Sequence, residues 1–119
     1  MKTIIIDGIK YVPESEVLNK AKDLGGMEYV IIRTCSAGVF AGYLEKRKGK
    51  EVMLRNARRL WSWYGASSLS QLAVDGVSKP TECKFPVEVE SIILTEVIEV
   101  VPCTQKAQDS IASVPVWKS

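Results

Sequence analysis

Two stretches of the chain have the apolar and polar pattern typical of β-strands. The first, "EYVIIRTCSAGVFAGYLEKRKGKEVMLRNARRLWSWYG" (residues 28–65), is interrupted by turn-forming residues at 36–38 and 48–50. It predicts three antiparallel strands in a meander. The second, "FPVEVESIILTEVIEVV", predicts a strand over about 85–89 and a longer one over 92–101.

The first 26 residues predict a hairpin followed by a helix. In "KTIIIDGIKYV" an Asp-Gly pair separates two short β-rich runs, which is a strong hairpin signal. Pro13 suits the first turn of a helix, apolar residues then recur at helical spacing, and two glycines follow Leu24, so we expect a helix over 13–24. We expect residues 1–26 to form an arm and residues 27–119 to form one core domain.

Two more short helices are expected in the second half of the chain. Ser67 or Ser68 suits the N-cap of the first, Gly76 its end, and Thr104 the N-cap of the second. The residues predicted to face inward are Leu69, Leu72, Ala73, Ala107, Ile111 and Ala112.

These elements predict the α+β class: an antiparallel sheet of about five or six strands with two or three short helices. We expect the helices on one face of the sheet, which leaves the other face for a partner. An uncovered sheet face invites self-association, so a homo-oligomer is expected.

Composition narrows the function. The 119 residues include 16 Lys+Arg and 14 Asp+Glu, a net charge of +2, which argues against nucleic acid as a partner. Histidine is absent, and the three cysteines form no C-x-x-C pair, so we expect no metal, no cofactor and no enzymatic activity. No apolar run reaches the roughly 20 residues that span a bilayer, so no membrane partner is expected.

The stretch "RNARRLWSWYGASSLSQLA" (residues 55–73) combines arginines, indoles and a predicted helix start. If residues 52–63 form a strand, its period of two puts Arg59, Trp61 and Trp63 on one face, and Asn56 and Arg58 on the other. Guanidinium groups stack on indoles and fork onto phosphate oxygens, so this surface could bind a base together with a phosphate. Alternatively, the tryptophans belong to the core and the arginines cover them.

Other residues extend this candidate site. A helix start at Ser67–Ser68 would offer unpaired backbone N–H groups to an anion, although serines there are more often simple caps. The segment "RTCSAG" (residues 33–38) combines an arginine with hydroxyls and a glycine at a turn. The predicted ligand-binding residues are Arg33, Ser36, Asn56, Arg58, Arg59, Trp61, Trp63, Ser67, Ser68 and Phe85, the last as an alternative to the tryptophans for stacking on a base.

The segments "YVIIRTCSAGVFAGYLE", "LRNARRLWSWYGASSLSQLAVDGV", "CKFPVEVESIILTEVIEVVPCT" and "VPVWK" resemble a family of small proteins of tailed bacteriophages and prophages, over about residues 27–119. The chain is also similar to phage anti-defence proteins that bind immune signalling nucleotides, in particular the Thoeris anti-defence proteins. This resemblance implies a protein of the host bacterial cytoplasm that sequesters a small signalling nucleotide of the cyclic ADP-ribose type without cleaving it. The alternative is a phage protein that binds a host protein or single-stranded nucleic acid through the Arg/Trp face.

Overall fold

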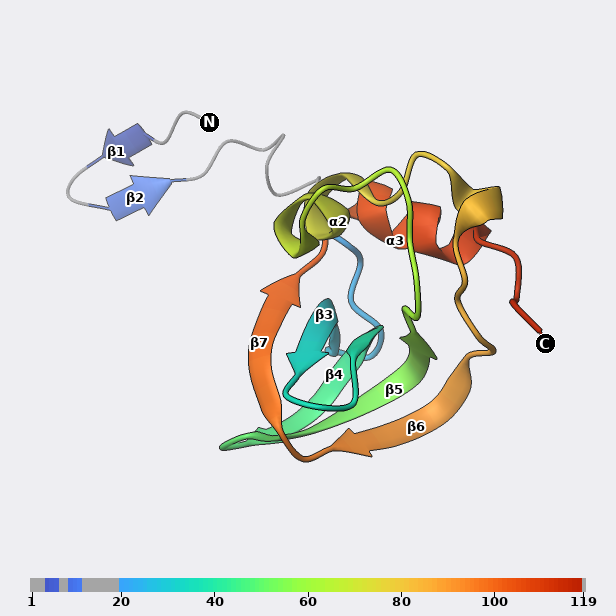
Figure 1. Cartoon of the computed structure of the whole chain (residues 1–119). Helices are drawn as coiled ribbons and strands as arrows, with labels where there is room; N and C mark the ends of the chain where they lie inside the picture. Colours follow the sequence, from blue (N-terminus) through green and yellow to red (C-terminus); the bar gives the residue numbers. More distant parts are fainter. Residues whose placement is uncertain (1–3, 7–8, 12–19, 119) are drawn as a thin grey trace.

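The computed structural model describes residues 4–6, 9–11 and 20–118 and has the predicted α+β class (Figure 1). In chain order its elements are β1 (Ile4–Ile6), β2 (Ile9–Tyr11), β3 (Glu28–Thr34), β4 (Val39–Lys48), β5 (Glu51–Arg59), α2 (Leu69–Asp75), the 3₁₀ helix η1 (Pro80–Glu82), β6 (Val89–Leu94), β7 (Val97–Pro102) and α3 (Gln105–Ser113). No helix in this described part is long and apolar enough to cross a membrane.

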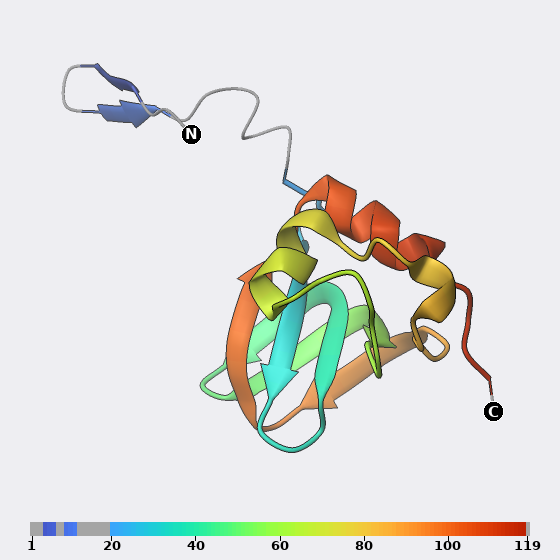
Figure 2. The same ribbon diagram turned by 45° about the horizontal axis from the view of Figure 1, so that its top comes forward.

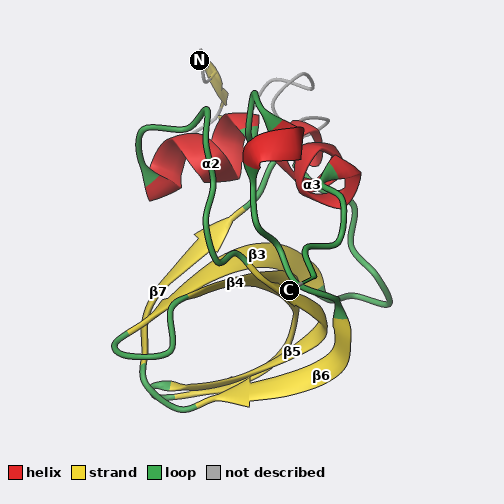
Figure 3. Cartoon of the chain, turned by 45° about the vertical axis from the view of Figure 1, so that its right-hand side comes forward, coloured by secondary structure: helices red, strands yellow, loops and turns green. Residues whose placement is uncertain are grey.

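Five strands form one antiparallel sheet in the order β6-β5-β4-β3-β7. The two edge strands, β6 and β7, follow each other directly in the chain, so the sheet has to curl until its edges approach. Figure 3 shows the resulting open barrel, with the helices above it. The corner between the edges is fixed by two backbone hydrogen bonds, from Val97 N to the Lys50 carbonyl at 3.0 Å and from Cys35 N to the Glu96 carbonyl at 2.8 Å.

Because the sheet curls, both of its faces are buried. Val30 and Ile32 face the barrel interior, whereas Tyr29 and Ile31 face α2 and α3, which lie on the same side of the sheet (Figures 1 and 2). The interior core consists of Val30, Ile32, Phe40, Val52, Leu54, Ala57, Leu94 and Val97. The prediction of helices on one face is confirmed, but the prediction of an open opposite face is wrong, because the sheet closes that face against itself.

A bulge in β5 reverses the expected alternation of its side chains. Gly42 of β4 faces both Asn56 and Ala57, and the backbone of Asn56 is left-handed, with φ of 50°. The close approach requires glycine on the opposite strand, since a Cβ at Gly42 would lie 3.0 Å from the Arg55 carbonyl oxygen. Beyond the bulge Ala57 faces the interior and Arg58 faces the helices, so the face assignment made for a regular strand over 52–63 is wrong; β5 also ends at Arg59.

The segment "FPVEVESIILTEVIEVV" (residues 85–101) bends at a different place from the one predicted. The predicted strands over 85–89 and 92–101 are replaced by β6 and β7, with the break at residues 95–96. The bend falls there because β6 pairs with β5, whereas β7 pairs with β3 across the barrel.

The N-terminal predictions divide into three outcomes. The hairpin is confirmed by the antiparallel pairing of β1 with β2. Residues 13–19 of the predicted helix lie outside the described residues. Residues 20–24 are not helical: Ala21 is buried, and its N–H donates to the Cys103 carbonyl at 3.1 Å. Among the described residues, Ala21 already belongs to the core and lies ahead of the expected boundary at residue 27.

The two later helices form as predicted. The Ser68 hydroxyl accepts a hydrogen bond from Gln71 N at 3.1 Å, and the Thr104 hydroxyl accepts one from Ala107 N at 3.1 Å. The residues that the two helices bury are Leu72, Ala73, Ala107 and Ile111. Ala112 is exposed, which corrects its predicted inward position.

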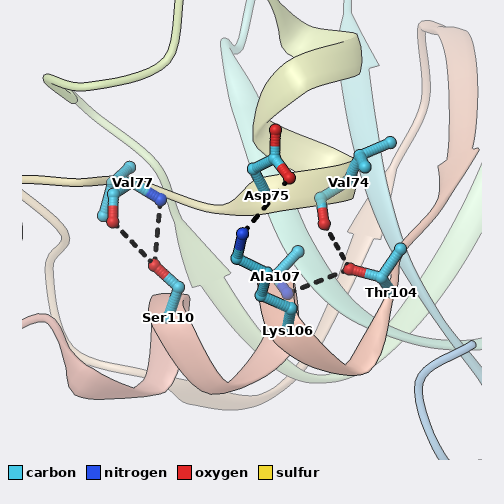
Figure 4. Close-up of polar contacts among 7 residues, drawn as sticks. All are labelled: Val74, Asp75, Val77, Thr104, Lys106, Ala107 and Ser110. Carbon is cyan, nitrogen blue, oxygen red and sulfur yellow. Dashed lines mark hydrogen bonds and ion pairs between the residues drawn. The ribbon is translucent and has the colours of Figure 1, made fainter. Parts of the chain in front are cut away.

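Polar contacts fix α2 against α3 (Figure 4). The Ser110 hydroxyl accepts from Val77 N at 2.9 Å and donates to the Val77 carbonyl at 3.1 Å. Thr104 donates from its hydroxyl to the Val74 carbonyl. The chain can pass this closely only at Gly76, whose φ is +75° and where a Cβ would lie 2.3 Å from Ser110 Cβ.

Candidate functional site

The β3–β4 turn and the end of β5 enclose a cleft of about 340 Å³. We call it the Arg59 cleft; its lining residues are Ser36, Ala37, Gly38, Val39, Arg59, Leu60, Trp61 and Trp63. Four of the predicted ligand-binding residues therefore lie together here, namely Ser36, Arg59, Trp61 and Trp63.

One wall of the cleft is a turn closed by Thr34. Its hydroxyl donates to the Gly38 carbonyl at 2.8 Å and accepts from Ala37 N at 2.9 Å. Gly38 has φ of +96°, a conformation that side chains with a Cβ rarely adopt. These bonds fix the backbone against which Ser36 and the Ala37 carbonyl are presented.

Arg59 is held by an aromatic ring and a carbonyl. Its guanidinium carbon lies 4.4 Å from the centroid of the Phe40 ring, and Nη1 donates to the Ala37 carbonyl at 2.6 Å. Arg59 forms no ion pair with the residues that the structure describes. The guanidinium is thus positioned, and its remaining N–H groups are available to an anion.

The two tryptophans of the cleft differ in exposure. The Trp61 residue is 63% exposed, whereas Trp63 is partly buried and packs against the core beneath the helices. A large exposed indole is uncommon on a soluble domain and is more informative than an exposed aliphatic residue. Trp61 therefore offers a stacking surface beside Arg59, and Trp63 forms part of the wall.

Arg58 lies on the face of β5 opposite Arg59, as alternation predicts, but it is outside the Arg59 cleft and only 7% exposed. Its guanidinium donates to four carbonyls, those of Phe85, Pro86, Ile111 and Val114, at 2.7–3.2 Å. Burial lowers the pKa of Arg58 from its usual value. This arginine ties β5 to the C-terminal end of α3 and to the chain around Phe85.

Ser67 and Ser68 do not form an anion site. The Ser67 hydroxyl and backbone N–H both donate to the Gln71 side-chain oxygen, at 2.7 and 2.9 Å, while Ser68 is the N-cap of α2. The Ser68 hydroxyl therefore caps a helix of seven residues, and the Ser67 hydroxyl is bonded to a side chain of that helix.

The remaining predicted residues are dispersed. Arg33 pairs with Glu99 at 2.6 Å across β3 and β7, and Phe85 is completely buried. Asn56 lines a different cavity, beside α3. Ala37, whose carbonyl orients Arg59, was not predicted from the sequence. Every residue has a backbone carbonyl, so the residue type gives no indication of such a contact.

Residues 27–111 match a protein family described as a domain of unknown function (DUF6948). No curated protein and no solved structure matches the chain.

Proposed function

The chain belongs to the DUF6948 family, whose description names no activity, and we propose that it binds a small nucleotide in the Arg59 cleft and sequesters it without cleavage. The observation that carries this proposal is the juxtaposition of Arg59, with free N–H groups, and the exposed indole of Trp61 in one cleft. A base stacks on the indole, and a phosphate accepts from the guanidinium and from the Ser36 hydroxyl.

The size of the cleft supports a compact ligand. Small-molecule sites span roughly 300–1,000 Å³, and the Arg59 cleft, at about 340 Å³, is near the lower limit. One base with its sugar and phosphate suits this volume better than an oligonucleotide does.

The chemistry of the lining supports binding rather than turnover. Arg59 is the only ionisable side chain among the described residues that line the cleft. Ser36 has no neighbouring base in that lining to activate its hydroxyl as a nucleophile. Cyclic ADP-ribose isomers are the first ligands to test, because they are the class that the resemblance proposed from the sequence would imply.

The proposal is tested by isothermal titration calorimetry of the full chain with AMP, ADP-ribose and cyclic ADP-ribose isomers. We expect one of them to bind, and both Arg59→Ala and Trp61→Ala to weaken that binding by about tenfold or more. Arg33→Ala is the matched control, since Arg33 is an exposed arginine outside the cleft and already paired with Glu99. Folded protein that binds none of these nucleotides contradicts the proposal.

Two further measurements separate the alternatives. Ligand recovered unchanged after incubation and protein denaturation supports sequestration, whereas a cleaved product indicates an enzyme. An affinity that falls steeply with salt, together with tight binding of single-stranded DNA, would indicate the nucleic-acid function instead.

A further inference from the structure

A second cavity, of about 380 Å³, lies between the helix-facing side of the sheet and α3. We call it the α3 cavity. The polar residues that line it are Tyr29, Tyr43, Asn56, Arg58, Glu88 and Gln108, and apolar residues of α3 and the chain after it complete its walls. It is separate from the Arg59 cleft, because Arg58 and Arg59 point to opposite faces of β5.

Two tyrosine hydroxyls open into the α3 cavity. The rings of Tyr29 and Tyr43 meet edge to face, with centroids 5.1 Å apart, and Gln108 Nε2 donates to the Tyr43 hydroxyl at 2.6 Å. Tyr43 therefore keeps its own proton available as a donor.

The Tyr29 hydroxyl is the stronger indication that the α3 cavity holds a ligand. Tyr29 is only 7% exposed, and its hydroxyl has no hydrogen-bond partner among the described residues. Within that part of the chain no fully enclosed side-chain oxygen or nitrogen is left unpaired, so this hydroxyl is not fully enclosed, and Tyr29 lines the cavity. Burial raises the pKa of Tyr29 above its usual value, so the hydroxyl stays protonated and can donate.

Arg58 makes the inner part of the cavity positive. Four of its five N–H groups donate to carbonyls, which leaves one on Nη1, and it forms no ion pair with any residue that the structure describes. Glu88, the only carboxylate among the described lining residues, is exposed, and its charge acts on the pKa of both Tyr29 and Arg58. The described lining of the site therefore carries one guanidinium and one carboxylate.

We propose that the α3 cavity binds a small zwitterion of the amino-acid class, with its carboxylate toward Tyr29, Tyr43 and Arg58 and its ammonium group near Glu88. An apolar side chain of the ligand packs on Ile111 and Val114, which are buried residues of the wall. Donors buried beside a guanidinium that forms no ion pair with the described residues suit a carboxylate, which would also accept a hydrogen bond from the Tyr29 hydroxyl.

The test uses the full chain and titrates L-leucine, L-isoleucine, L-methionine and L-phenylalanine by calorimetry. Two derivatives of the amino acid that binds best are then titrated. The amide lacks the carboxylate, and the N-acetyl derivative lacks the ammonium charge. We expect both derivatives to bind at least about tenfold more weakly. Equal binding of the amide would overturn the orientation proposed here, and folded protein that binds none of the four amino acids would overturn the site.

Two conservative variants test the residues. Tyr29→Phe removes the unpartnered hydroxyl and keeps the ring, and Glu88→Gln removes the carboxylate charge; each should weaken amino-acid binding by about tenfold. Tyr64→Phe, at an exposed tyrosine outside the cavity, is the matched control and should bind normally. Arg59→Ala should leave this binding unchanged, so the two proposed sites can fail independently. Wild-type affinity in Tyr29→Phe would overturn the proposal.

Discussion

At the scale of the residue, Arg58 and Arg59 show how neighbouring side chains of one type acquire different tasks. Successive residues of a strand point to opposite faces, so one guanidinium enters the core and the other borders a cleft. Arg58 satisfies four carbonyls, whereas Arg59 makes one such bond and keeps the rest of its donors free. Adjacent arginines therefore differ in their contacts: Arg58 joins buried carbonyls, and Arg59 keeps donors free at the Arg59 cleft.

We accordingly predict that Arg58→Ala and Arg59→Ala act on different properties. Arg58→Ala should lower the free energy of unfolding by roughly 3 kcal/mol or more, because each buried polar group left unpaired costs ~1–3 kcal/mol. Arg59→Ala should change it by less than about 1 kcal/mol, since that side chain is only partly buried. Urea unfolding followed by tryptophan fluorescence measures both. Equal stability of the two variants would contradict the distinction.

Alternation separates Arg58 from Arg59, but the sequence could not show which of them faces the helices, because that depends on the bulge at Asn56. A regular strand puts Arg58 on the same face as Leu54, and Arg59 on the same face as Ala57. The bulge keeps Arg59 on the face of Ala57 but moves Arg58 to the face opposite Leu54. A bulge is set by the pairing of two strands, and Asn at a left-handed φ is only weakly favoured by its own chemistry. Alternation did place Arg59 with the two tryptophans and apart from Arg58, but it could not show that Arg58 is buried against the helices.

At the scale of the element, the two later helices, α2 and α3, follow local signals and were predicted well, unlike the predicted helix over 13–24, which is absent at residues 20–24. Ser68, Gly76 and Thr104 each act through backbone groups within a few residues of themselves, so their roles can be inferred without the fold. The positions of strands β6 and β7 could not be inferred in this way. Their break at residues 95–96 follows from pairing with β5 and β3, which are distant in sequence.

The junction between α2 and α3 gives a prediction at this scale. Gly76→Ala combines a strained positive φ with a clash against Ser110, whereas Gly49→Ala has a positive φ of +59° but nothing within 4 Å of the added Cβ. Both variants should have a lower free energy of unfolding than the wild type. The decrease should be larger in Gly76→Ala than in Gly49→Ala, by more than about 1 kcal/mol. Thermal unfolding of the two variants beside the wild-type chain measures the difference. Matching midpoints would show that the helices separate to accept the methyl group.

At the scale of the whole molecule, the fold depends on contacts that join the ends of the core domain. β7 pairs with β3, and Cys103, directly after β7, donates from its N–H to the Tyr29 carbonyl and accepts from Ala21 N. The N-terminal edge of the core, the first strand of the sheet and the start of α3 therefore meet at one buried residue. The inner core of the barrel forms only when this closure brings both edge strands together.

This closure predicts a specific dependence of stability on pH. Burial, with a smaller contribution from the nearby Glu28, raises the pKa of the Cys103 thiol from 9.0 to about 12. In the unfolded chain the thiol ionises near its usual pKa, so between these two values unfolding releases a proton that the folded state retains. The stability that the buried, protonated Cys103 thiol contributes is therefore fully present below about pH 9 and is lost as the pH rises toward about 12.

We expect the free energy of unfolding of the wild-type chain, measured with urea at about pH 7.5 and about pH 10, to fall between the two. In Cys103→Ala the decrease should be smaller, although that variant is less stable throughout because a buried sulfur is removed. Burial also raises the pKa of Tyr29, so Tyr29→Phe should likewise reduce the decrease. If Cys103→Ala lost as much stability as the wild type over this interval, the thiol would not be enclosed by the closure of β7 on β3, and the barrel would be open at this end in solution.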